Sequence, residues 1–213
     1  MPLMKGAFVV FTTPAPVPTD IIVFQFNSET LTRRLEPPKE NTANQGTSAR
    51  GAAGASHQTR PPTETLTVSI DLDASDKLQD GDPIATAVGL HPAIAQLELL
   101  MYPPSLLLIL NKILALAGVA SFDPPKSPLV LFVWGTTRLL PVHVNSVQIT
   151  EQQFDNRLNP IVARAEVALT VLHEDDLSQP FATLATVTHV AKEGLARIGT
   201  VDSALDVTSL LPF

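Results

Sequence analysis

Residues Ile161–Val171 read IVARAEVALTV, and every odd position in this stretch carries an apolar side chain. The even positions include Arg164, Glu166 and Thr170. Strict alternation of this kind is typical of a β-strand with one buried face. The stretch Glu64–Leu72 (ETLTVSIDL) repeats the pattern, with Leu66, Val68, Ile70 and Leu72 on one face. These two stretches predict a chain built mainly from β-strands.

Outward from these two stretches, the chain holds further strand and helix patterns. Leu140–Ile149 alternates until the phase slips at Ser146, which predicts a β-bulge or a change of sheet. Other strands are expected at Lys5–Thr12, Asp20–Phe26, Thr30–Leu35 and Leu129–Trp134. Helices are expected at Pro92–Met101, after Pro103-Pro104, and at 180–198, where apolar residues recur every three or four positions. The chain is therefore predicted to be a mostly β fold with a few peripheral helices.

Two insertions interrupt this pattern in a single predicted domain spanning residues 1–213. Residues 36–62 contain no large apolar side chain, so they cannot offset their ordering entropy and are expected to form a mobile polar loop. Residues 103–125 are apolar and are expected to form a helical insertion. Residues 199–213 are expected to be a short tail.

Composition excludes several functional classes. The 213 residues carry a net charge of −7, which argues against a phosphate backbone as the main partner, so no nucleic acid is expected. The absence of cysteine removes disulfides, thiolate metal sites and cysteine nucleophiles. Ser105–Phe122 is nearly long enough to span a membrane, but Asn111 and Lys112 near its middle favour a buried or interface helix. Without a signal peptide, the chain is expected to stay in the cytoplasm after synthesis.

Two polar stretches contain residues that could bind a metal ion or act as a general base. In Asp71–Asp82, Asp71, Asp73, Asp76 and Asp82 resemble the ligands of a calcium loop. Asp76 stands where an EF-hand needs glycine, which favours a solvated acidic turn over the calcium alternative. His173-Glu174-Asp175-Asp176 could supply a general base, but it follows a strand, where a polar turn is expected anyway. No catalytic residue, metal site or cofactor is therefore predicted.

Four segments, taken in order, resemble a known family. They are Lys5-Gly-Ala-Phe-Val, Ile22–Arg33 with VFQFNSETLTR, Leu129–Gly135 with LFVWG, and Leu139–Pro160. Together they are similar to the tube proteins of contractile injection systems. The closest likeness is to the baseplate hub component between the inner tube and the spike of extracellular, phage-tail-like particles. Such proteins often carry a LysM-like module, whereas Ala204–Phe213 is only a short tail, so no LysM module is expected.

The resemblance implies a phage-tail tube-like β-barrel or sandwich that assembles as a six-membered ring without catalysis. It also implies partners: copies of the chain itself, a trimeric VgrG-like spike, a tube initiator or inner tube protein, and baseplate wedge proteins. Assembly would occur in the cytoplasm, within a particle that can become extracellular after release. The alternatives are a tube initiator or ordinary tube subunit, a calcium- or ligand-binding β domain, and a membrane-associated protein. Spare apolar residues mark interface candidates: Leu106, Leu110, Val133, Trp134, Leu210, Leu211 and Phe213.

Overall fold

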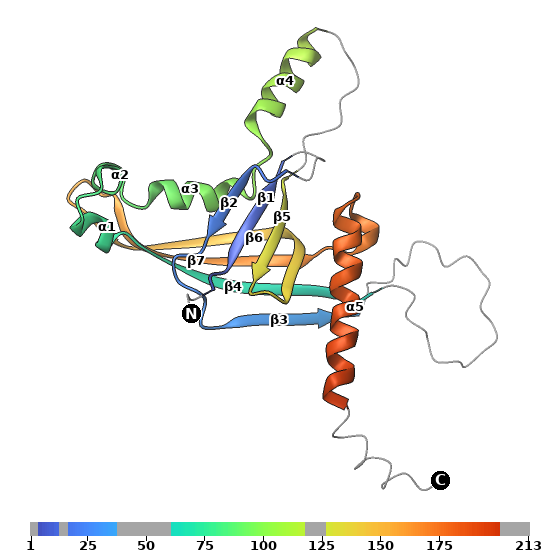
Figure 1. The fold of residues 1–213 in the computed structure, drawn as a ribbon. Coiled ribbons are helices and arrows are strands. Elements are labelled where there is room, and N and C mark those ends of the chain that lie inside the picture. The colour runs from blue at the N-terminus through green and yellow to red at the C-terminus, as the bar shows by residue number, and fades with distance from the viewer. Residues whose placement is uncertain (1–3, 13–16, 38–60, 118–126, 201–213) are drawn as a thin grey trace, which may run out of the picture.

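Seven antiparallel strands form one sheet in the order β2-β1-β5-β6-β7-β4-β3 (Figure 1). The computed structural model describes residues 4–12, 17–37, 61–117 and 127–200. The strands are β1 (Ala7–Phe11), β2 (Asp20–Val23), β3 (Leu31–Glu36), β4 (Thr63–Asp73), β5 (Leu129–Trp134), β6 (Arg138–Phe154) and β7 (Pro160–Val171). The helices are α1 (Ser75–Gln79), α2 (Pro83–Val88), α3 (His91–Leu99), α4 (Ser105–Leu116), the short 3-10 helix η2 (Glu174–Asp176) and α5 (Phe181–Thr200). The mostly β expectation is confirmed.

Strand β6 joins the two halves of the sheet. Its first residues pair with β5, while Val142–Phe154 pairs with β7. The register shifts between Val144 and Ser146, so the irregularity expected at Ser146 is present. Figure 1 shows β1, β2 and β5 running across the direction of β3, β4 and β7, which places the two halves over a shared core.

The core lies between these halves and is closed by α3. From one half, Phe8, Phe24 and Phe132 pack together, with ring centroids 4.9 Å apart for Phe8 and Phe24. Gly6 makes this contact possible, because a Cβ there would lie 2.7 Å from the Phe24 ring. The other half contributes the alternating apolar faces of β4 and β7, as their patterns predict. Ile94 and Leu97 of α3 are buried against the same core.

The sheet is not closed into a barrel, so of the two expected forms, barrel or sandwich, the barrel is wrong. Strand β2 has only four residues, and the chain then crosses to β3 at the opposite edge of the sheet. Gln25 links the two halves with side-chain bonds: its amide donates to the Asp73 carbonyl over 2.7 Å and accepts from the Asp73 N–H over 3.0 Å. Alternation predicts strands, but closure depends on the length and tilt of the edge strands.

Several element boundaries differ from the sequence prediction. Glu36 pairs with Thr63 at the end of β3 instead of belonging to the 36–62 loop, whose residues 38–60 lie outside the described part. Helices α1 and α2 occupy the region predicted as an acidic turn. The apolar insertion 103–125 is helical over Ser105–Leu116, and α5 matches the predicted 180–198 helix closely.

Candidate assembly site

Among the described residues, the edge strands β2 and β3 are each paired with a neighbour on one side only. On β2, Ile21 and Val23 are 54% and 57% exposed. On β3, Leu35 is 52% exposed. A strand edge with unpaired N–H and C=O groups is a template for pairing with another chain, particularly where its side chains are apolar. These edges are therefore candidate contact surfaces for a second copy.

A buried ion cluster fixes the β3 edge to β4 and to α5. Glu64 of β4 is only 4% exposed. Its carboxylate accepts from Arg33 Nε over 2.6 Å and from Lys192 Nζ over 2.7 Å. Arg33 lies on β3 and Lys192 on α5, so a single carboxylate ties together three elements that are distant in the sequence. A buried charge is tolerated when it is paired and hydrogen-bonded in this way.

The charge state of Glu64 follows from the balance of these contacts. Burial on its own would raise the pKa of Glu64, since it disfavours the charged form. Hydrogen bonds from Lys192 and Arg33, together with their positive charges, outweigh burial and lower the pKa below its ordinary value of 4.5. Glu64 is therefore a carboxylate at neutral pH, and the cluster carries both signs of charge.

The sequence analysis did not identify this cluster. Glu64 occupies the same alternating register as Leu66 and Val68, so its position in β4 indicated a buried side chain. A charge on the apolar face of a strand is the signal that could have identified it. Its partners Arg33 and Lys192 could not be found in this way, because they are far from Glu64 in the sequence.

A cavity of about 300 Å³ lies beside the cluster, between η2, α5 and the strands. His173, Glu174 and Asp175 of the stretch considered as a general base line it, and the first two make structural contacts. His173 Nε2 lies 3.0 Å from the Pro62 carbonyl oxygen, and the Glu174 carboxylate accepts from Thr186 Oγ1 over 2.6 Å. Asp176 closes the turn, since its carboxylate accepts from the His173 N–H. These contacts hold the start of α5 against the end of β7.

The four aspartates weighed as calcium ligands serve separate local roles. Asp71 pairs with Arg164 Nε over 2.6 Å, and the Asp73 carboxylate accepts from the Ser75 N–H over 2.7 Å. Hydrogen bonds from Ser75 hold the pKa of Asp73 below its usual range. Asp82 caps α2 by accepting from two backbone N–H groups, and Asp76 lies in the first turn of α1. Among the described residues, no three His, Asp or Glu side chains gather as a metal site.

The structure describes the side chains of only two of the seven interface candidates. Val133 is partly buried and packs in a small cluster with Phe11 and Phe181, where α5 covers part of the sheet. Trp134 packs on Phe132, with centroids 5.8 Å apart, at the margin of the main core. The side chains of Leu106 and Leu110, and the whole of Leu210, Leu211 and Phe213, lie outside what the structure describes.

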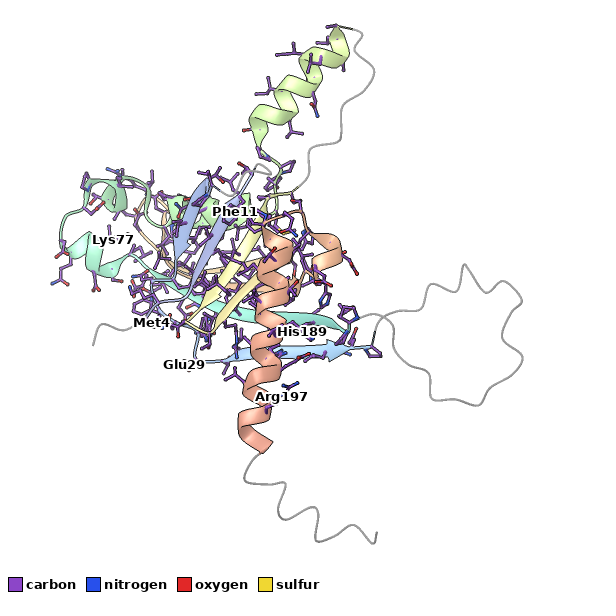
Figure 2. All side chains as sticks on the ribbon, turned by 45° about the vertical axis from the view of Figure 1, so that its right-hand side comes forward. Met4, Phe11, Glu29, Lys77, His189 and Arg197 are labelled. Carbon is purple, nitrogen blue, oxygen red and sulfur yellow. The ribbon has the colours of Figure 1, made fainter. Side chains whose placement is uncertain are left out.

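Exposed apolar side chains also gather on two helices, α4 and α5. On α4, Ile109, Ile113 and Leu116 are exposed, and Figure 2 shows the helix standing clear of the sheet. On α5, Val187, Val190 and Leu195 are exposed. Along the sequence they flank Lys192, the α5 residue of the ion cluster. Large exposed apolar patches usually mark interaction sites.

Comparisons with protein-family models and with curated proteins find no match for this chain. Among the described residues, no helix is both long enough and apolar enough to cross a membrane. The candidate site is therefore assessed from its own geometry: two unpaired strand edges, one of them anchored by a buried ion cluster, and two helices with exposed apolar faces.

Proposed function

We propose that this chain is a structural ring protein of a contractile injection system, acting as a baseplate hub that joins a hexameric inner tube to a trimeric spike. In this role it performs no catalysis. It helps to nucleate tube assembly, and it transmits force through its interfaces when the surrounding sheath contracts. The proposal rests on the ordered sequence resemblance together with one structural observation.

That observation is the open sheet with two unpaired edges. A monomer that worked alone would gain by protecting these edges, and natural proteins commonly do so with charges, prolines or covering elements. Here β3 carries such charges in Arg33, Arg34 and Glu36, but it also presents Leu35 to solvent, and β2 presents Ile21 and Val23. Because the two edges differ, a contact between β2 of one copy and β3 of the next is head-to-tail. Repeated head-to-tail contacts form a ring when the rotation between copies closes.

The buried ion cluster supports the same proposal. Arg33 on the β3 edge is held by Glu64, and Glu64 is also held by Lys192 of α5. The β4 carboxylate that holds the β3 edge is therefore itself held by helix α5. A ring that is driven outward as one body needs contact surfaces that keep their shape under load.

The experiment is electron microscopy of the purified chain, alone and with its spike protein. The expected result is a ring of six copies of the 22.8-kDa chain, about 137 kDa, surrounding a pore. The spike is included because ring closure can require a template. A layer of three copies or one, or a protein that stays monomeric in both conditions, would refute the ring. A ring that stacks on itself without binding a spike would assign the chain to the ordinary tube instead.

A further inference from the structure

Helix α4 is apolar apart from Ser105, Asn111 and Lys112, and several of its described apolar side chains are exposed in a single copy. Leu108, Ile109 and Ile113 are 46%, 57% and 57% exposed, and Leu116 is 83% exposed. Figures 1 and 2 show the helix rising from the end of α3, away from the sheet. A helix that exposes this many large apolar side chains is normally covered by protein or lipid. Helix α4 therefore needs a partner.

Helix α5 offers a surface of matching length. Val187, Val190 and Leu195 are 58%, 60% and 59% exposed, and Ala191 lies between them. Spacings of three and four residues place these side chains on one face, which we call the α5 stripe. The adjoining face of α5 meets the sheet through Phe181 and Lys192, and Leu195, three residues after Lys192, lies at the border between the two faces. At about 1.5 Å per residue, Leu108–Leu116 and Val187–Leu195 each span about 12 Å.

The two helices lie at opposite ends of one copy. In both views α4 is at the top, and the second half of α5 extends below the sheet (Figures 1 and 2). They do not meet within this fold, so a contact between them joins two copies. Such a contact uses two different surfaces and is head-to-tail, which is the kind of contact that generates a ring or a filament.

Charge favours the same pairing. Lys112 is the only charged residue of α4, and Glu193 lies on α5 beside the stripe with a 56% exposed side chain. Each copy carries a net charge of −7, so two copies repel unless opposite charges meet where they touch. We propose that α4 of one copy packs along the α5 stripe of the next copy, with Lys112 facing Glu193. This inference rests on the proposed ring and names the helices that connect its subunits.

The chain contains no cysteine, so introduced cysteines can report this contact directly. The full-length variants are Ile113→Cys on α4 and Ala191→Cys on α5, with Leu116→Cys and Val187→Cys as a second pair for another register. Under mild oxidation, each single variant alone should remain uncross-linked, and an equal mixture should give covalent dimers. A chain carrying both cysteines should give a ladder of products. Ala196→Cys, on the opposite face of α5 from the stripe, is the matched control and should give no dimers with Ile113→Cys.

A charge exchange provides the second measurement. Lys112→Glu and Glu193→Lys should each lower the cross-linked fraction at least threefold, and the two changes together should restore it. Cross-linking of Ile113→Cys to itself, or no cross-linking by either pair, would overturn the α4–α5 contact. So would binding of full-length protein to phosphatidylcholine vesicles that Ile113→Asp abolishes, because lipid would then be the partner of α4.

These results are separable from failure of the proposed function. Six-fold rings of unmodified protein that show no α4–α5 cross-link would refute this contact while leaving the ring in place. Cross-linked open filaments without any ring would support the contact and refute the ring.

Discussion

The buried Glu64 should be more sensitive to losing both of its cations than to losing either one. The perturbations are Arg33→Ala and Lys192→Ala, made singly and together. Either cation alone leaves the carboxylate paired at 2.6 Å or 2.7 Å. The side chains of Arg33 and Lys192 are 38% and 42% exposed, so solvent weakens each individual pair. We therefore expect each single change to lower the free energy of unfolding by about 1 kcal/mol.

The double variant leaves a carboxylate with a 5% exposed side chain and neither cation. An uncompensated buried charge costs about 3–5 kcal/mol, so the double change should exceed the sum of the single changes by at least about 1 kcal/mol. Urea unfolding at neutral pH, followed by circular dichroism, measures all four proteins. Arg34→Ala is the matched control, because Arg34 lies on the same strand and its pair with Glu36 is exposed. It should change stability by about 0.5 kcal/mol or less.

Additive effects of the two single changes would refute this reasoning, as would equal losses for Arg33→Ala and Arg34→Ala. Acid provides an independent check. The pKa of Glu64 is lowered, so its pairing stabilises the folded state above the unfolded pKa and is lost as pH falls through the folded pKa. The stability difference between wild type and Glu64→Gln should therefore be full near neutral pH and shrink below about pH 4.5. A difference that grows in acid would contradict the cluster.

Three further predictions concern other parts of the fold. Val133→Asp should lower the free energy of unfolding by about 2–4 kcal/mol, because Val133 packs with Phe11 and Phe181, and thermal melts should show no such loss for Thr137→Asp in the exposed turn before β6. Asp82→Ala should cost about 1 kcal/mol by removing the cap of α2, equally with and without calcium, and a loss seen only with calcium would restore the metal alternative. Replacing residues 38–60 by a short turn should change stability by about 1 kcal/mol or less, since Glu36 and Thr63 already pair, and collapse of the β signal in circular dichroism would show that the segment is part of the fold.

Local patterns in the sequence predicted the strands well, because the burial of alternate side chains is a local property. The faces of β4 and β7 and the irregularity at Ser146 follow from spacing alone. The order of the strands in the sheet does not follow from such local spacing. Whether β2 meets β3 depends on strand length and on the bend in β6, which no single stretch encodes. Of the predicted barrel or sandwich, the barrel is therefore wrong, because closure of a sheet depends on such long-range features.

The acidic stretch shows a different limit. Asp82 precedes Pro83, and an aspartate followed by proline is a common start of a helix. Read for ligands, the same residues resembled a calcium loop, because capping and coordination both use carboxylate oxygens. Geometry separates the two: the Asp82 carboxylate accepts from the N–H groups of Ile84 and Ala85, both over 2.9 Å. The pair Asp82-Pro83 on its own therefore indicates a capped helix start, as the structure shows.

The position of Lys192 connects the stability of the subunit to its proposed assembly. Lys192 lies within Val187–Leu195 and contacts Glu64 of the sheet, directly beside the exposed α5 stripe. The contact that fixes the β3 edge therefore also sets the orientation of the stripe. Releasing it would leave most of the core intact, because Glu64 and its partners lie at the end of the apolar face of β4. A Lys192→Ala subunit that folds but fails to form rings is the expected result, because Lys192 acts with Phe181 and Thr186 in holding α5, and with it the α5 stripe, against the sheet.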